Sequence, residues 1–197
     1  MRAVIGLGNP GERYARTRHN VGFMAAETFL DRHGRGGAAR IESGALVAEA
    51  RWAGATLLVA RPQLMMNLSG PPVLALCRRH RMDAADLVIA YDDADLPFGR
   101  VRVRPDGRAA GHNGMASIVE ALGTEAIPRV RIGIGRPPRE KGGLAGHVLE
   151  GFSAGEVEAV GTMIAEAAEA IEVLLRDGVK EAMNRFNRRR DEGGTEA

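Results

Sequence analysis

The chain has 197 residues, 45% of them hydrophobic and 26% charged, which is the composition of an ordinary globular protein with a substantial core. Its single cysteine, Cys77, excludes a disulfide framework and favours a reducing compartment. Because no apolar run reaches the length of a membrane span or has the form of a secretory signal, we expect a cytoplasmic protein with no membrane partner.

The net charge is only +2, but its make-up is skewed, since every basic residue except Lys141 and Lys180 is an arginine. Arginine presents a planar fork of donors that suits phosphate groups. A biased genome composition would give the same skew, so the pattern is only weak evidence for a nucleic-acid partner.

The first half of the chain alternates predicted strands and helices. Residues 2–8 form a short apolar run that ends in glycines, which predicts a buried strand and a tight loop. Apolar residues at helical spacing predict a helix over 21–34 that a glycine ends. Two strands, 45–52 and 55–62, flank a two-residue turn, and the prolines in the first turn of 69–80 are typical of a second helix.

The second half continues this alternation. Residues 86–99 read as an apolar strand that runs into an acidic loop, and 100–104 alternate with the period of a strand. Residues 113–123 predict a helix that ends at a glycine, and 129–135 predict another strand. Strands that alternate with helices predict an α/β fold, here a single-domain mixed β-sheet flanked by helices.

The C-terminal part is predicted to be helical. Ser153, followed three residues later by Glu156, forms a capping-box signature at the start of a long helix within 152–178. We expect its apolar stripe to pack in the core; the stripe consists of Val157, Val160, Ile164, Ile171 and Leu174. A short helix over 179–186 follows the break at Gly178.

The chain contains no internal repeat and no interdomain linker. We therefore expect one domain over 1–187 and a tail over 188–197 that is too polar to pack. Residues 136–146, rich in proline, glycine and charge, form a candidate mobile loop. No spare apolar stripe points to a second subunit, so we expect a monomer.

One motif suggests a nucleotide. Gly6, Gly8 and Gly11 match the G-x-G-x-x-G pattern of dinucleotide-binding proteins, and Asp31 follows at a fitting distance. In that fold the third glycine lies inside a helix and the acid ends a second strand. Here Pro10 and a polar segment occupy that region, and Asp31 falls within the predicted helix. A nicotinamide-dependent oxidoreductase is therefore a minor alternative, which a titration with NAD(H) or NADP(H) would test.

Polar residues stand at several junctions between strands, loops and helices. They are Asn9, His19, Asn67, Asp92, His112 and Asn113. Taken singly, each has a structural explanation, because asparagine and aspartate suit turns and helix caps and most histidines are structural. Convergence of such loops on one side of a sheet favours a common site.

These residue types limit the chemistry. No G-x-S-x-G elbow is present, and Cys77 lies in an apolar helical run, a poor place for a nucleophile. Asp92, Asp93 and Asp95 could hold a metal, but no H-x-x-x-H or C-x-x-C spacing supports such a site, so we expect none. What remains is a histidine base, an aspartate that orients it and amides that bind a carbonyl or oxyanion. This set suits attack by water on an ester.

Several motifs occur in the order and spacing of bacterial peptidyl-tRNA hydrolases, which the chain resembles from residue 3 to about residue 187. They are GLGNPGERYARTRHNVGF, MNLSGPPV, DDADLPFG, AGHNG and RVRIGIGRP. The resemblance implies hydrolysis of the ester between an N-blocked peptide, or an N-acyl-aminoacyl group, and the 3′ end of tRNA. That reaction recycles tRNA from stalled or aborted translation. It implies peptidyl-tRNA as the partner, water activated by a histidine, no cofactor or metal and no covalent intermediate.

Matched by motif, the resemblance places the catalytic base at His19 and its partner carboxylate at Asp92. Asn9 matches a residue that helps to distinguish blocked peptidyl-tRNA from free aminoacyl-tRNA. The further substrate contacts are expected at Tyr14, Met65, Met66, Asn67, His112 and Asn113. Two departures concern the substrate contacts: Met65 stands where members commonly have an aromatic residue, and alanines replace glycines in the loop before His112.

Arginines and valines alternate over residues 100–104, which places Arg100, Arg102 and Arg104 on one face of a strand. The resemblance matches phosphate-binding positions to Arg102, Arg104 and Arg131. The structural alternative is a solvated edge strand whose charges discourage aggregation.

A non-catalytic RNA-binding protein on the same scaffold is the second alternative. Loss of His19 or Asp92 would be its mark, and both residues are present. Incubation with N-acetyl-aminoacyl-tRNA and with unblocked aminoacyl-tRNA would distinguish a hydrolase from a binding protein.

Overall fold

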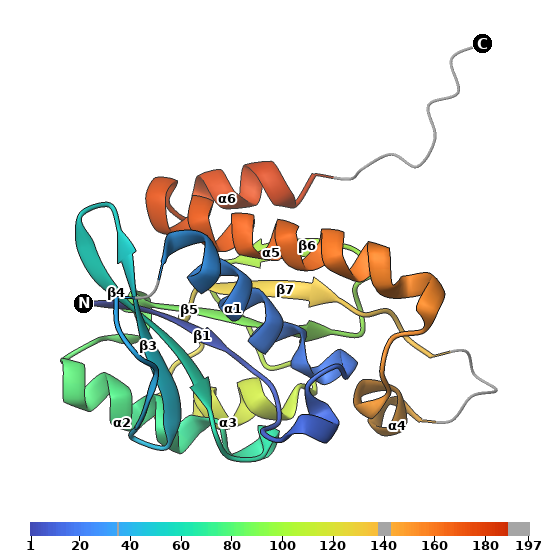
Figure 1. Ribbon diagram of the computed structural model, residues 1–197, viewed down its shortest axis with the longest axis horizontal. Coiled ribbons are helices and arrows are strands. Elements are labelled where there is room, and N and C mark those ends of the chain that lie inside the picture. Colours follow the sequence, from blue (N-terminus) through green and yellow to red (C-terminus); the bar gives the residue numbers. More distant parts are fainter. Residues whose placement is uncertain (35, 138–142, 189–197) are drawn as a thin grey trace, which may run out of the picture.

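The computed structural model describes residues 1–34, 36–137 and 143–188. Within these residues, seven strands form one sheet in the order β2-β3-β4-β1-β5-β7-β6 (Figure 1). The central strands β4, β1, β5 and β7 are parallel, whereas β2, β3 and β6 pair in the antiparallel sense. The predicted α/β fold with a mixed sheet flanked by helices is confirmed. The division into a domain over 1–187 and a tail over 188–197 stays a prediction, since 189–197 lie outside the described residues.

The strands follow the sequence pattern closely. They are β1 (Arg2–Gly6), β2 (Arg40–Glu42), β3 (Ala45–Trp52), β4 (Ala55–Pro62), β5 (Leu87–Asp93), β6 (Val101–Arg104) and β7 (Arg129–Gly133). Between β3 and β4, Ala53 and Gly54 both have positive φ, 47° and 80°, as a tight two-residue hairpin turn requires. Only β2 was not predicted, because a three-residue edge strand with two exposed residues carries no readable alternation.

The helices are α1 (Val21–His33), α2 (Gly70–His80), α3 (Asn113–Leu122), α4 (Leu144–Leu149), α5 (Val157–Asp177) and α6 (Val179–Phe186). The predicted capping box of Ser153 and Glu156 is present, just before α5. Val157 is 61% exposed, so its predicted place in the core stripe is wrong; the buried residues of α5 begin only at Met163. Among the described residues, no helix combines the length and the apolar character that crossing a membrane needs.

Helix α4 corrects the predicted loop over 136–146. Leu144 to Gly146 form its first half, while 138–142 lie outside the described residues. Six residues with two glycines nearby give too short a pattern for a helix to be read from sequence.

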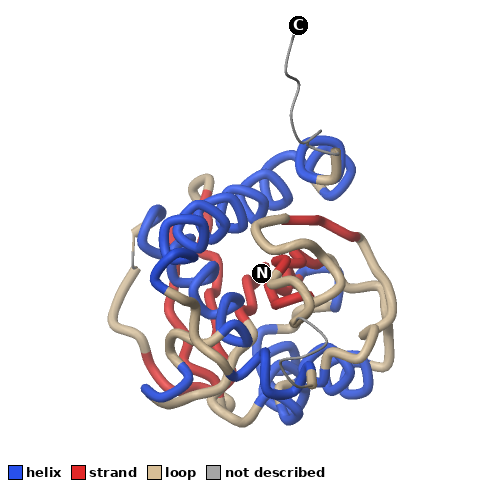
Figure 2. The backbone as a smooth tube through the Cα atoms, turned by 90° about the vertical axis from the view of Figure 1, so that its right-hand side faces the viewer, coloured by secondary structure: helices blue, strands red, loops and turns tan. Residues whose placement is uncertain are grey.

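Helices cover both faces of the sheet. Helices α1, α5 and α6 lie on one face, and α2 and α3 lie on the other (Figures 1 and 2). Neighbouring residues of β1 show the consequence, since Val4 packs into the first cluster and Ile5 into the second, both fully buried. Burial on both faces explains why the central strands read as continuous apolar runs.

Two glycines bring α1 against the sheet. A Cβ at Gly6 would come within 2.4 Å of the carbonyl oxygen of Gly22, and one at Gly22 within 2.3 Å of that of Ala90. The amide of Phe23 donates to the carbonyl of Leu7 at 3.0 Å. Gly6, at the end of β1, therefore serves contact with α1, and two short 3-10 turns, not a helix, follow the strand. This is not the dinucleotide-binding arrangement.

Candidate active site

The polar residues predicted to converge come from loops at the carboxyl ends of the parallel strands. Asn9 follows β1, Asp92 lies near the end of β5, and Met66 and Asn67 lie in a 3-10 turn after β4 (Met66–Leu68). His19 belongs to another 3-10 turn (Arg18–Asn20), directly before α1. His112 directly precedes α3. The close contact of α1 with β1 and β5 holds His19 over the end of β5.

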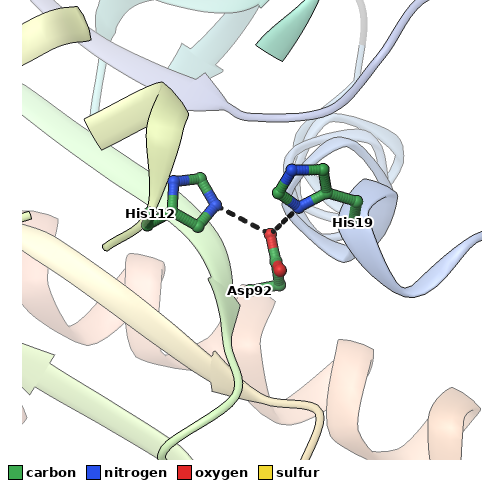
Figure 3. Close-up of side chains that lie close together, drawn as sticks. All are labelled: His19, Asp92 and His112. Carbon is green, nitrogen blue, oxygen red and sulfur yellow. Dashed lines mark hydrogen bonds and ion pairs between the residues drawn. The ribbon is translucent and has the colours of Figure 1, made fainter. Parts of the chain in front are cut away.

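His19, Asp92 and His112 form one hydrogen-bonded group (Figure 3). The same oxygen of Asp92, Oδ1, lies 2.8 Å from Nδ1 of His19 and 2.9 Å from Nε2 of His112. The two rings are tilted against each other, with centroids 5.1 Å apart. Asp92 is 3% exposed, so the three side chains make a nearly enclosed carboxylate with two imidazole partners.

The hydrogen bonds define which ring nitrogens carry protons. Nδ1 of His112 accepts from the backbone amide of Met115 at 3.1 Å and caps α3, so the proton of a neutral His112 is on Nε2 and is donated to Asp92. His19 likewise donates from Nδ1 to Asp92. Its Nε2 then carries a lone pair and has no partner among the described residues. This is the tautomer that a general base needs.

Asp92 is held in its ionised form. Burial alone would raise the pKa of its carboxyl, but the electrostatic interaction and hydrogen bond with His112, and then those with His19, outweigh burial and hold that pKa well below its usual range. An ionised, buried carboxylate fixes the His19 ring and stabilises a positive charge on it.

A cavity of about 210 Å³ lies beside this group. Its lining includes His19, Tyr91, His112 and Asn113, and Leu144 of α4 forms part of the wall. The ligand atoms of His19, Asp92 and His112 lie within 4.8 Å of one another, a spacing that a metal ion could use only if both imidazoles gave up their hydrogen bonds to Asp92. The expectation of no metal stays a prediction.

Asn9 lies against a different cavity, of about 280 Å³, together with Asn20, Phe23 and Arg61. The Asn9 side chain is 3% exposed, and its Oδ1 accepts from the backbone amide of Met66 at 2.7 Å. Because that amide needs an acceptor, the oxygen of Asn9 must face Met66, and Nδ2 is left to donate elsewhere. Asn9 and His19 therefore line different cavities at the same end of the sheet.

The remaining predicted contact residues are distributed around these cavities. Asn113 is exposed, lines the His19 cavity and is the first residue of α3, so the cap suggested for it is in fact made by His112. Met65 is 42% exposed and Asn67 is also exposed, and neither lines the two cavities. Tyr14 is half-buried, with the guanidinium of Arg13 4.5 Å from its ring centre.

The arginines differ among themselves. Arg102 and Arg104 point away from the core on the edge strand β6, whose Val101 and Val103 are buried, as the alternation predicts. Arg131 on β7 is half-buried and its Nε lies 2.5 Å from a carboxylate oxygen of Asp93. Arg131 is therefore tied to the acidic loop beside Asp92, whereas Arg102 and Arg104 make no ion pair within the described residues.

Sequence reasoning missed two residues that hold the His19 segment. Arg18 is 8% exposed, and its guanidinium donates to both carboxylate oxygens of Glu156 at 2.9 Å and lies 4.6 Å from the ring centre of Phe152. Asn20, 2% exposed, binds the backbone of Asn9. In the sequence, the only indication of a role for these two residues is that they stand directly before and after His19. The partnership of His112 with Asp92, in place of a substrate contact alone, was also not foreseen.

Comparison with known proteins agrees with this arrangement. The family model described as peptidyl-tRNA hydrolase matches residues 3–193. The chain belongs to the peptidyl-tRNA hydrolase family. A peptidyl-tRNA hydrolase of Chloroflexus aurantiacus is 47% identical over 185 residues, which cover 93% of this chain and 97% of that protein. The one of Mycobacterium tuberculosis is 46% identical over 184 residues, covering 93% and 96%.

Solved structures of the family share the fold. The crystal structure of peptidyl-tRNA hydrolase from Acinetobacter baumannii superposes with a TM-score of 0.86 at 30% identity, over 95% of this chain and 94% of that one. The predicted family is thereby confirmed, and the seven-stranded sheet that carries the candidate site is the family's fold.

Proposed function

We propose that this member of the peptidyl-tRNA hydrolase family hydrolyses the ester between an N-blocked peptide, or an N-acyl-aminoacyl group, and the 3′ end of tRNA. Water is the nucleophile, His19 is the general base, and no covalent intermediate forms. The observation that carries the mechanism is the hydrogen bond from Nδ1 of His19 to the buried Asp92, which leaves Nε2 of this cavity-lining imidazole without a partner among the described residues. Family membership supplies the substrate class.

The cavity favours water over a protein nucleophile. Among the described residues, those that line it include no serine, threonine or cysteine. Cys77 is buried in α2, and burial raises the pKa of its thiol, so it does not supply a thiolate. Histidine-assisted attack by water is the route that these residues support.

The reaction then runs in two steps. A water bound to Nε2 of His19 attacks the ester carbonyl carbon as its proton passes to Nε2, and Asp92 stabilises the imidazolium. The tetrahedral intermediate collapses, the bond to the ribose oxygen breaks, and the imidazolium returns the proton to that oxygen. Amide donors such as that of Asn113, in the same cavity lining, would stabilise the oxyanion.

Asn9 accounts for the preference for blocked substrates. Its oxygen is occupied by the amide of Met66, so its side chain offers only N–H donors. A blocked substrate carries a carbonyl oxygen next to its first α-nitrogen, which can accept from such a donor. A free aminoacyl-tRNA carries an ammonium there, which is itself only a donor, and the two would be mismatched.

The tRNA itself would bind through arginines of β6 and β7. Arg102 and Arg104 have no ion-pair partner among the described residues, and Arg131 lies on the neighbouring strand, between them and Asp93. Phosphate contacts of this kind fix the position of a nucleic acid without reading its sequence. We further propose that the enzyme acts as a monomer in the cytoplasm.

Parallel incubation of the purified protein with N-acetyl-aminoacyl-tRNA and with unblocked aminoacyl-tRNA tests the proposal. Rapid release of tRNA from the blocked substrate and slow release from the free one are expected. His19→Ala protein, purified in the same way, controls for a contaminating hydrolase of the expression host. Equal rates with both substrates, or equal rates for both proteins, would contradict it.

A further inference from the structure

The side chain of Asn20 grips the backbone of Asn9. Its Oδ1 accepts from the amide of Asn9 at 2.8 Å, and its Nδ2 donates to the carbonyl of Asn9 at 3.0 Å. Asn20 is 2% exposed and Asn9 is 3% exposed, so no water competes freely for these groups. A paired donor and acceptor at one residue fix both the position and the direction of that peptide segment.

These hydrogen bonds leave Asn9 only one polar group with which to bind a ligand. Asn20 occupies the backbone amide and carbonyl of Asn9, and the amide of Met66 occupies its Oδ1. Only the Nδ2 donors have no partner among the described residues. Two other chain segments, one after β4 and one before α1, thus fix the orientation of the Asn9 side chain.

Asn20 also links Asn9 to the base. It follows His19 directly, and its own amide donates to the carbonyl of Thr17 at 3.0 Å, so both residues belong to one rigid 3-10 turn. Nδ1 of His19 binds Asp92 while the next side chain binds Asn9. The distance between the base and the Asn9 donor is therefore set by one pair of adjacent residues.

The surrounding fold does not depend on this grip. Leu7 donates to Ala90 at 2.9 Å and accepts from Phe23 at 3.0 Å, so β1 and α1 are joined by backbone bonds of their own. Loss of the Asn20 side chain would release Asn9 and Pro10, at the start of a loop that turns at Gly11 with φ 102°.

We propose that Asn20 is a positioning residue for substrate selection, which acts through Asn9 and sets its donor relative to His19. This inference rests on the proposed function, in which Asn9 favours blocked over free substrates. Asn20→Ala should lower kcat/KM for N-acetyl-aminoacyl-tRNA by about 10²-fold, as misplacement of a contact by about 1 Å does, and should affect unblocked aminoacyl-tRNA much less. The pH profile should keep its shape, because the His19–Asp92 hydrogen bond is untouched.

A matched control is available in Asn187. Its side chain makes the same pair of bonds to one backbone residue, since Oδ1 accepts from the amide of Val103 and Nδ2 donates to its carbonyl, both at 2.9 Å. Asn187→Ala removes an equivalent pair at the outer edge of β6. The ratio of the two substrates' kcat/KM values cancels any change in tRNA binding, so this control should leave the ratio as in the wild type.

A double-mutant cycle with Asn9→Ala decides the outcome. If Asn20 acts through Asn9, the double variant should be no less selective than Asn9→Ala alone. Selectivity lost in Asn9→Ala but kept in Asn20→Ala would overturn the inference and leave the proposed function standing, and additive losses would overturn it too. No loss in Asn9→Ala would instead remove Asn9 from the proposed function.

A second variant tests the inference if Asn20→Ala does not fold. Asn20→Asp keeps the acceptor for the amide of Asn9, but it replaces the donor with a carboxylate oxygen that faces the carbonyl of Asn9, so it should be less selective than the wild type. Thermal melting of each variant selects those that are folded at the assay temperature. Full selectivity in a folded Asn20→Asp and a folded Asn20→Ala protein would contradict the inference.

Discussion

The candidate site and the edge strand β6 use polar residues in opposite ways. At the site, Asn9, Asn20 and Asp92 are at most 3% exposed, and each is held by hydrogen bonds to other residues of the site. On β6, Arg102 and Arg104 face outward without an ion pair among the described residues. Buried polar groups must be paired, and pairing fixes their geometry, as chemistry requires.

Exposed charges follow the other rule. They stay hydrated and mobile until a phosphate approaches, and binding then gains from the release of counterions. We therefore propose that the buried residues set rate and selectivity and that the arginines of β6 set affinity for the tRNA body. Arg131, paired with Asp93, stands between the two regions.

The largest effect is expected at the base. His19→Ala should lower kcat by about 10²- to 10⁴-fold, the usual contribution of general base catalysis. Binding of tRNA, measured by filter retention or fluorescence anisotropy, should be unchanged, because the arginines are untouched. Turnover close to that of the wild type would show that His19 is not the base.

The partner carboxylate should come next. Asp92→Asn should reduce the rate at neutral pH by about tenfold or more, within the range of base catalysis as a whole. In the wild type the pKa of Asp92 is held below its usual range, so it stays ionised throughout the assay range. Its removal takes a negative charge from beside His19, which disfavours the imidazolium.

The acid limb of the rate profile of Asp92→Asn should accordingly move to lower pH, since the imidazole stays neutral further into acid. Rates recorded from pH 5 to pH 9 on both proteins measure the shift. An unchanged limb and height would separate Asp92 from the reaction.

A smaller and different effect is expected on β6. Replacing Arg102 and Arg104 together with Ala should raise KM for substrates that carry full tRNA and reduce the slope of log K against log salt by roughly 2, about one for each phosphate contact. A peptide esterified to a short 3′ fragment should react as before, because it does not extend to that strand.

Arg51→Ala offers a control for this pair, since Arg51 is also an exposed arginine of the sheet, on β3 toward the opposite edge. Equal damage to long and short substrates would indicate a disturbed strand. No damage to either would favour the reading of a solvated edge.

The smallest effect should follow removal of metal ions. His19, Asp92 and His112 are close enough to hold an ion, but one nitrogen of each imidazole is already engaged with the same carboxylate oxygen. Dialysis against EDTA should leave kcat within experimental error. Strong inhibition by EDTA that a divalent metal reverses would show that His19, Asp92 and His112 bind a metal ion. The proposed mechanism would then be wrong.

The sequence by itself determined the local structure and the chemical residue types. The hairpin of 45–52 and 55–62 and the Ser153–Glu156 cap depend on neighbours only a few residues apart, so pattern and turn chemistry suffice to read them. Motifs also named His19, Asp92 and Asn9. They could not say which atoms of these residues meet.

Only the tertiary structure decided those contacts. The bond between Asn9 and Met66 spans 57 positions and that between His19 and Asp92 spans 73, and such pairs form only when parallel strands bring their carboxyl ends together. The contact of His112 with Asp92 has the same origin, whereas the hydrogen bonds of Asn20 to Asn9 join two residues of the single connection between β1 and α1. How deeply a side chain is buried, and which of its donors stay unpaired, depend on all the segments packed around it. A local sequence pattern does not contain that information.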